Sequence, residues 1–250
     1  MITLQERPWF WRAGLAVGVM ALCRIGALFV SASRGYRMAG RSRPFQRELP
    51  HCRARVLVIG DSTGVGTGAQ CAEDSIAGLL AREFPDVAVT NHARNGAKAA
   101  DAARQLANLP AGRFDVVFVH VGANDVMRAT PLPQLEADIT ATLRAARERA
   151  DTVIFMSAPN MGLCPAFFPP FSWLLTMRTR QAREMFIRIS AQEGVTYIDL
   201  FRERDEDVFS REPSRYFASD RLHPTSERYR AAYQAICEGS ALHHVLRPPA

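Results

Sequence analysis

Five short apolar runs, separated by stretches with helical periodicity, constrain this chain most. The runs are rich in branched residues, and two of them end directly before a glycine. Buried strands of a parallel sheet have this character because helices cover both faces of the sheet. The five predicted strands are Val56–Ile59, Val87–Thr90, Asp115–Val121, Thr152–Met156 and Val195–Leu200. The alternation predicts a three-layer α/β/α fold around a central five-stranded parallel sheet.

The predicted helices between these strands repeat apolar residues every three or four positions. One follows Pro131 and Pro133, another closes at Gly194, and the last begins at Pro224, a residue favoured in the first helical turn. In folds of this kind the reactive groups lie in the loops at the carboxyl ends of the strands. The predicted catalytic residues should therefore come from those loops.

Three of these loops, and one segment near the C-terminus, carry residues suited to acyl transfer. The four blocks are Gly60-Asp61-Ser62, Asn95-Gly96, Gly122-Ala123-Asn124-Asp125 and Asp220-Arg221-Leu222-His223-Pro224. In this order they resemble the SGNH/GDSL hydrolase family of serine esterases and lipase-like acyl hydrolases, whose four blocks supply a Ser, a Gly, an Asn and a His. The resemblance covers about residues 55–240 and implies the flavodoxin-like SGNH hydrolase fold. Thr63 departs from the longer family signature, which usually has Leu there, but that position has no chemical role.

The resemblance implies a role for each block. Ser62 is the expected nucleophile, His223 its general base, and Asp220 the acid that orients the imidazole and stabilises its protonated form. The backbone N–H groups of Ser62 and Gly96 and the side-chain amide of Asn124 are the expected oxyanion-hole donors. This chemistry requires neither a metal nor a cofactor, and neither is predicted.

Several other polar residues receive structural interpretations. Asp61 and Asp125 are expected to bind loop backbone, and His120, inside an apolar strand, is expected to be a packed core residue. No spacing typical of metal ligands relates His51, His92, His243 and His244. The first loop also satisfies the G-x-S-x-G pattern of α/β-hydrolases and resembles a dinucleotide fingerprint. Only one good strand precedes Ser62, and no acid ends the second strand, so both alternatives are disfavoured.

The net charge of +6 is unevenly distributed. Residues 1–55 hold ten arginines and two acids, whereas the rest of the chain has 21 basic and 23 acidic residues. The globular part therefore has no basic excess for a nucleic-acid surface, and no nucleic-acid partner is predicted. The five cysteines form no C-x-x-C motif and are interpreted as thiols, with a Cys52–Cys71 disulfide as the alternative.

The basic excess belongs to an N-terminal arm, residues 1–50, which precedes a hydrolase domain at residues 51–245. Residues 13–31 form an apolar stretch interrupted by Arg24 and flanked by other arginines. A cleaved signal peptide, a single membrane anchor and an interfacial helix are all open interpretations. Membrane association is favoured, on the cytoplasmic side by the arginine count, and the domain is expected to fold and act without the arm.

Three functions follow from the resemblance. The first is hydrolysis of acyl or aryl carboxylic esters, or thioesters, through an acyl-enzyme; the substrate is a small molecule or derives from a lipid. The others are carbohydrate O-deacetylation by the same residues and non-catalytic lipid or glycan binding. The aromatic segment Pro165–Leu175 is expected to form an apolar wall or lid near the active site, which favours an acyl substrate. Packing against the N-terminal arm is the alternative for this segment. Neither the natural substrate nor the oligomeric state follows from the sequence.

Overall fold

A single parallel sheet organises the protein. The computed structural model describes residues 8–247, with side chains from residue 15 onward except those of residues 17 and 21. The strands are β1 (Ala54–Gly60), β2 (Val87–Asn91), β3 (Val116–His120), β4 (Thr152–Met156) and β5 (Thr196–Ile198). They pair in the order β2-β1-β3-β4-β5, and every pairing is parallel. The predicted five-stranded parallel sheet is therefore confirmed, with strand ends shifted by up to two residues.

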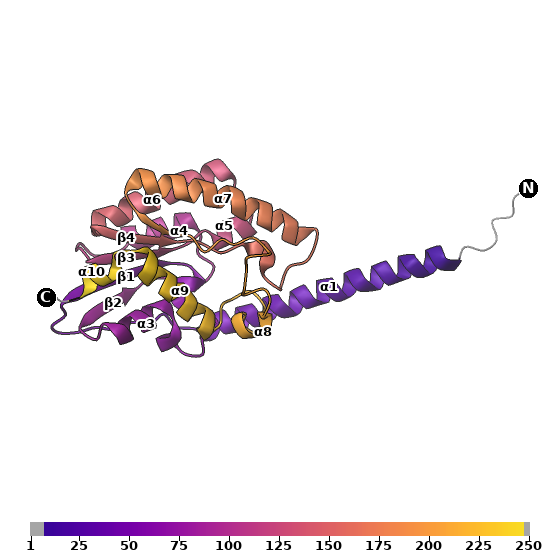
Figure 1. Cartoon of the computed structure of the whole chain (residues 1–250), viewed down its shortest axis with the longest axis horizontal. Helices are drawn as coiled ribbons and strands as arrows, with labels where there is room; N and C mark the ends of the chain where they lie inside the picture. Colours follow the sequence, from indigo (N-terminus) through magenta and orange to yellow (C-terminus); the bar gives the residue numbers. More distant parts are fainter. Residues whose placement is uncertain (1–7, 248–250) are drawn as a thin grey trace, which may run out of the picture.

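Helices cover both faces of this sheet, as Figure 1 shows. One face packs against α4 (Ala99–Ala107), α6 (Leu132–Arg149) and α7 (Phe171–Glu193) through a large apolar cluster. The other face packs against α3 (Ile76–Glu83), α9 (Ser226–Gly239) and α10 (Leu242–Leu246) through a second cluster. Short helices α2 (Ser62–Val65), α5 (Ala123–Met127) and α8 (Pro213–Tyr216) belong to the connecting loops. The three-layer α/β/α prediction is confirmed.

The last long helix begins later than the sequence indicated. Pro224 pairs with Phe217 in an isolated antiparallel bridge, and Thr225 is the N-cap of α9, which begins at Ser226. The bridge holds the preceding loop in a closed turn, because the Ala218 N–H also donates to the His223 carbonyl at 2.8 Å. The loop that carries Asp220 and His223 is thereby fixed before the helix begins.

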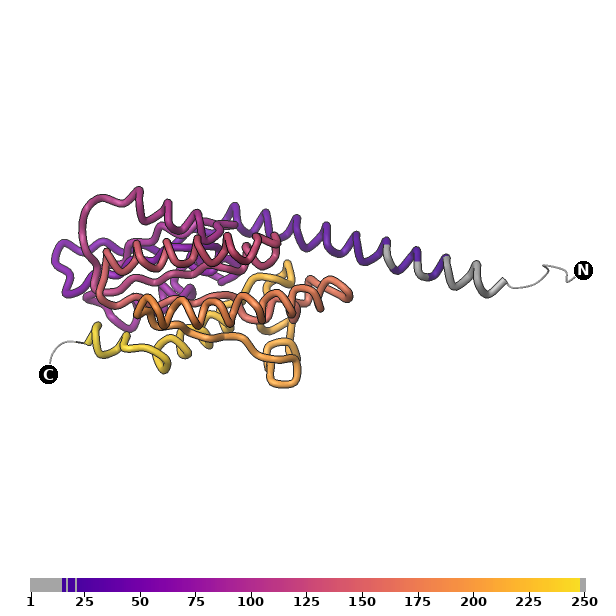
Figure 2. The backbone as a smooth tube through the Cα atoms, turned by 90° about the horizontal axis from the view of Figure 1, so that it is seen from above, coloured from indigo at the N-terminus to yellow at the C-terminus, as the bar shows by residue number. Residues whose placement is uncertain are grey.

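A 34-residue helix, α1 (Pro8–Arg41), precedes the sheet and projects from it (Figures 1 and 2). Every residue from 22 to 27 is exposed, whereas half-buried positions recur from residue 28 onward. Leu28, Ser31, Gly35, Met38 and Ser42 are half-buried, a spacing that places them on one face of a helix. Within residues 8–247, no helix combines the length and apolar character needed to cross a bilayer.

The segment after α1 runs along the outer edge of β2. Arg47 and Val89 form an antiparallel bridge, with N–H to carbonyl distances of 2.9 and 2.8 Å. The side-chain amide of Gln46 donates to the Asn91 carbonyl and accepts from the Asn91 N–H, both at 2.9 Å. The Arg47 guanidinium binds the carbonyls of Ala81, Phe84 and Val87. We call residues 46–47 the edge strap.

Candidate active site

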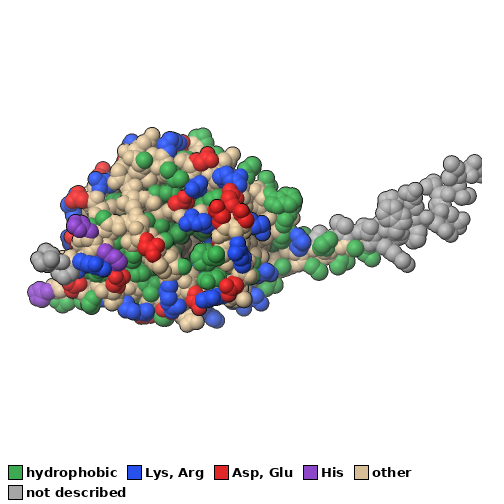
Figure 3. All heavy atoms as spheres, in the orientation of Figure 1, with side chains coloured by type: hydrophobic (Ala, Val, Ile, Leu, Met, Phe, Trp, Pro, Cys, Tyr) green, Lys and Arg blue, Asp and Glu red, His purple; other side chains and the backbone are tan. Residues whose placement is uncertain are grey.

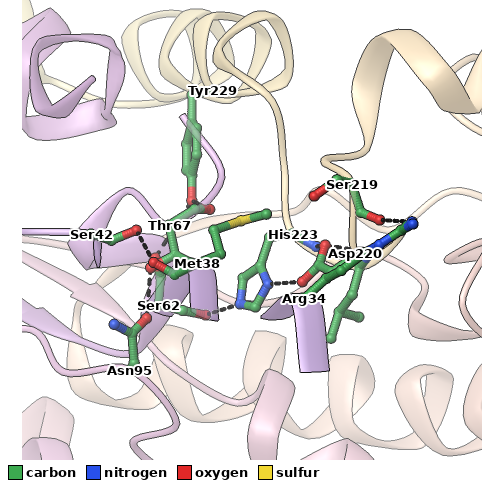
Figure 4. A network of polar contacts seen from close by, with 11 residues as sticks. Arg34, Met38, Ser42, Ser62, Thr67, Asn95, Ser219, Asp220, His223 and Tyr229 are labelled. Carbon is green, nitrogen blue, oxygen red and sulfur yellow. Dashed lines mark hydrogen bonds and ion pairs between the residues drawn. The ribbon is translucent and has the colours of Figure 1, made fainter. Parts of the chain in front are cut away.

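Figure 4 shows a chain of hydrogen bonds that runs from Ser62 through His223 to Asp220. His223 Nε2 is 3.1 Å from Ser62 Oγ, and His223 Nδ1 is 2.5 Å from Asp220 Oδ2. Ser62 is the first residue of α2, directly after β1, so the strand end sets its position. The Asp61 carboxylate caps α2 by accepting the Thr63 N–H at 2.8 Å. In this arrangement an imidazole can accept the proton of a serine hydroxyl while a carboxylate orients the imidazole.

The loop from Ala218 to Pro224 supplies both the acid and the base. Asp220 Oδ1 accepts the N–H groups of Leu222 and His223 at 3.1 and 3.0 Å. Its other carboxylate oxygen is therefore free to face the imidazole. Arg221 makes the turn in the left-handed region, with φ of 62°. This backbone conformation brings an acid and a histidine three residues apart into direct contact.

The Asp220 carboxylate is buried, with 1% of the residue exposed. Burial by itself would raise the pKa of Asp220, but the hydrogen bond and charge of His223 and the two loop N–H groups lower that pKa below its usual value. The acid therefore remains ionised at neutral pH, the state in which it can stabilise a protonated imidazole.

The other two predicted oxyanion-hole residues, Gly96 and Asn124, line the same cavity as Ser62 and His223. Gly96 has φ of 77°, a left-handed conformation that glycine adopts without strain. Asn124 lies in the first turn of α5, after β3, and its side-chain amide donates to the Ala97 carbonyl at 3.0 Å. That bond ties Asn124 to the Gly96 loop and leaves its second amide hydrogen for a ligand.

The cavity has a volume of about 890 Å³, large enough for a small organic ligand. Much of its wall is apolar, and the residues that contribute include Ala158, Met161, Leu200, Val208, Phe209 and Leu222. A second part of the wall comes from α1, through Gly35, Tyr36, Ala39 and Gly40. The sequence analysis did not predict that α1 would line the cavity. The small residues in its last turns, between arginines, were the feature that could have indicated close packing.

The aromatic segment Pro165–Leu175 does not line this cavity, contrary to the predicted wall or lid. Helix α7 begins at Phe171 and buries Ser172, Leu175 and Thr179 on one face, so Phe171, Trp173 and Leu174 point outward and are exposed. The Arg24 guanidinium of α1 lies 4.9 Å from the centre of the Phe168 ring. The alternative interpretation, in which this segment packs against the N-terminal arm, agrees with that contact.

The remaining titratable groups have structural environments. His120 is 1% exposed, and burial lowers its pKa to about 4, in agreement with a packed core residue. Burial raises the pKa of Asp61 to about 6, against the opposing hydrogen bonds from Thr63. Asp125 accepts the Ala99 N–H at 2.9 Å, the backbone role expected for it. All five cysteines are free, so the thiol interpretation is confirmed and the Cys52–Cys71 disulfide is wrong.

One group of side chains away from the cavity has the composition of a metal site. Glu83, Cys237 and His243 each place a ligand atom within 4.8 Å of the others, and His243 Nε2 is 2.7 Å from Glu83 Oε1. Glu83 is far from Cys237 and His243 in the sequence, which explains why spacing rules did not find the group. The group lies at the α3, α9 and α10 ends and contributes nothing to the cavity lining.

Comparisons with known proteins agree with this geometry. A family model for the GDSL-like lipase/acylhydrolase family matches residues 58–231, more than half of the chain. The chain belongs to this family.

A GDSL-like esterase of Mycobacterium tuberculosis is 26% identical over 204 residues, which are 78% of this chain and 64% of that protein. The structure of TesA superposes with a TM-score of 0.59 at 19% identity, over 77% of this chain and 99% of that one. A variant of the acetyl-xylooligosaccharide esterase Axe2 from Geobacillus superposes with a TM-score of 0.53 at 19% identity, over 75% and 94% of the two chains. These structural likenesses establish the SGNH hydrolase fold.

Proposed function

We propose that this family member hydrolyses carboxylic esters through an acyl-enzyme on Ser62. The supporting observation is the unbroken contact from Ser62 Oγ through the His223 imidazole to the buried Asp220 carboxylate. His223 Nε2 takes the hydroxyl proton as Oγ bonds to the ester carbonyl carbon. The carbonyl oxygen becomes an oxyanion that faces the N–H groups of Ser62 and Gly96 and the Asn124 amide.

Collapse of this intermediate breaks the bond to the alcohol oxygen, and His223 passes its proton to the leaving alcohol. Water then attacks the acyl-enzyme, His223 takes a proton from that water, and the proton returns to Ser62 as the acid departs. The Asp220 carboxylate remains ionised during both acylation and deacylation because its pKa is lowered. Thioesters follow the same course with a thiol as the leaving group.

The cavity lining favours an acyl or aryl ester. Apolar side chains dominate the wall beyond the triad, so an acyl chain or aromatic ring can be desolvated there. Carbohydrate O-deacetylation by the same residues is the second candidate, and the structural likeness to an acetyl-xylooligosaccharide esterase supports it through the shared fold alone. A non-catalytic binding role is disfavoured because the nucleophile, base and acid are all present and in contact.

We further propose that α1 contacts a lipid surface, which would supply lipid-derived esters. The described side chains of α1 include eight large exposed apolar residues: Leu15, Val19, Met20, Leu22, Ile25, Phe29, Val30 and Tyr36. At 100° per residue all of them except Met20 fall within about 140° of arc, which makes one apolar face. Exposed apolar area of this extent is typical of a contact surface.

Charge favours an anionic lipid for this face. Arg34, Arg37 and Arg41 are exposed at one edge of this arc, with Arg37 just inside it and the other two just outside. None of the ion pairs among the described residues involves them. Basic residues close to an anionic membrane contribute about 1 kcal/mol each to binding. Figure 3 shows apolar side chains along the described part of the projecting helix. A helix of this kind lies in the interface without crossing the bilayer.

A fluorophosphonate probe tests the proposed mechanism. Ser62 should be labelled, because only an activated serine attacks phosphorus at a useful rate. Ser62→Ala should lose labelling and lower kcat on p-nitrophenyl esters by about 10⁶, the scale measured for a comparable serine nucleophile. The matched control is Ser157→Ala, which removes another serine of the same cavity and should keep labelling. Undiminished turnover in Ser62→Ala would refute the mechanism, and a series from acetyl to long acyl esters would distinguish acyl from acetyl preference.

A further inference from the structure

The last turns of α1 lie directly against the catalytic acid. Gly35 approaches Asp220 so closely that a β-carbon at position 35 would stand 3.0 Å from Asp220 Oδ2. That oxygen is the one that accepts from the His223 imidazole. A contact of 3.0 Å is tighter than nine in ten real β-carbon contacts, so a side chain at position 35 would shift the helix or the carboxylate by at least a few tenths of an ångström.

Two hydrogen bonds attach the same turns to the loops of the site. Arg34 Nη1 donates at 3.1 Å to the carbonyl of Ser219, the residue before Asp220. Asn95, the residue before Gly96, donates from its side-chain amide to the Ala39 carbonyl at 3.1 Å. The Asn95 side-chain oxygen accepts from the Thr67 hydroxyl at 2.6 Å. Figure 4 shows Arg34, Ser219, Asn95 and the triad in one network. One helix therefore contacts both the loop with the acid and the loop with an oxyanion-hole donor.

We propose that the C-terminal turns of α1 are part of the catalytic centre and that Gly35 is a positioning residue for Asp220. The absence of a side chain lets the helix cover the carboxylate, which is 1% exposed, and keep water from its contact with the imidazole. Exclusion of water strengthens the charge interaction that develops when His223 is protonated. The inference rests on the proposed Ser62 mechanism and assigns to the arm a role in it.

The test compares substitutions at two glycines of the same helix. Gly35→Ala and Gly35→Leu add side chains against Asp220, whereas Gly26→Leu adds one where nothing lies within 4 Å. Alanine and leucine are better helix formers than glycine, so a weaker helix cannot explain a loss of activity. The full-length variants are assayed on p-nitrophenyl acetate, a short soluble ester that needs no lipid surface.

Gly35→Leu should lower kcat by about 10²-fold, the scale of a displacement of about 1 Å in a catalytic group. Gly35→Ala should cause a smaller loss, and Gly26→Leu should equal the unmodified protein. The effect should fall on kcat, because Asp220 acts in the transition state through His223. The acidic limb of the kcat/KM profile should move to lower pH in Gly35→Ala, since a displaced carboxylate holds the imidazole proton less well.

Three outcomes would overturn the inference. One is equal activity in Gly35→Leu and Gly26→Leu, and another is an effect of Gly35→Ala confined to KM, which would make Gly35 a pocket wall alone. The third is a lower kcat in Gly35→Ala with an unmoved pH profile. Thermal melts accompany each variant, and Gly35→Ala decides the matter if Gly35→Leu does not fold. Persistent activity in Ser62→Ala would instead refute the proposed function, so the two failures are distinguishable.

Discussion

The two halves of α1 have opposite surroundings although they form one continuous helix. From residue 28 onward, half-buried positions recur on one face, and the helix contacts the Asp220 loop and the Asn95 loop. Toward the N-terminus the helix extends away from the domain, and Leu15 and Leu22 are 71% and 70% exposed. Between residues 15 and 27 every described side chain is exposed, and Arg24 near the Phe168 ring contacts the domain there. The second half instead packs against two loops of the domain.

The residue types on the helix match this division. The face toward the domain has small residues at the positions of closest approach, notably Gly35 and Ala39. Large apolar residues occupy the outward face along both halves, including Phe29 and Tyr36 beside the docked turns. Small residues let the helix backbone approach a loop closely, whereas large apolar residues provide contact area for lipid. Under our proposal, one face of the helix therefore packs against protein and the opposite face against lipid.

The largest expected effect comes from removing the two halves separately. Deletion of residues 1–25 should leave kcat on p-nitrophenyl acetate within about twofold, because the docked turns remain. It should strongly reduce sedimentation with anionic vesicles, because Leu15, Leu22 and Ile25 are lost. Deletion of residues 1–41 should abolish sedimentation and lower kcat by about 10²-fold. Circular dichroism checks that both shortened proteins fold. Equal kcat in the two deletions would contradict the comparison and restore the sequence-based expectation that the domain acts without the arm.

A charge placed on the outward face should have the next largest effect. Leu22→Asp and Phe29→Asp should each weaken binding to phosphatidylglycerol vesicles by more than tenfold, since burial of such a side chain contributes about 1.5–3 kcal/mol. Ala27→Asp is the matched control: it adds the same charge at an exposed position away from the apolar face and should cost about fivefold. Activity on the soluble ester should not change in any of the three. Equal losses of vesicle binding would show that charge alone, and no apolar face, governs binding.

The smallest expected effect concerns the arginines beside that face. Arg37→Gln and Arg41→Gln should each weaken binding to anionic vesicles by about fivefold, near 1 kcal/mol per basic residue. Salt should reduce this difference because it screens exposed charges. Vesicles of phosphatidylcholine alone supply the comparison, since a neutral surface should not distinguish the variants from the unmodified protein. A loss that persists on neutral vesicles would point to a structural role for these arginines.

The sheet was predictable because burial on both faces leaves a distinct sequence pattern. Val116–His120 is buried throughout, and its run of apolar residues identified it as a strand. The blocks that resemble the family also identified Ser62, just after β1, and His223, in the loop between α8 and α9. The approach of α1 to the catalytic loop was not predictable, because Gly35 and Asp220 are 185 residues apart and a glycine gives no periodic signal.

The aromatic segment was misinterpreted for a related reason. Phe171, Trp173 and Leu174 indicated an apolar surface correctly, but composition does not say which way a helix turns it. Ser172 and Thr179 occupy the buried face of α7 although they are polar, and Leu175 lies between them. The orientation of α7 depends on which of its faces packs against the rest of the fold. Hydrophobicity alone therefore assigned the exposed aromatic face of α7 to the cavity wall, which was wrong.

The edge strap has a consequence for self-association. Strand β2 is an outer strand, and an open outer strand presents unpaired N–H and C=O groups that recruit strands from other molecules. The Gln46 side-chain amide pairs with the backbone groups of Asn91. The Arg47 backbone pairs with that of Val89. The opposite outer strand, β5, has three residues and offers little length for such pairing. A chain shortened beyond Arg47 would thus expose a template for aggregation, whereas one that begins before Gln46 would keep that edge closed.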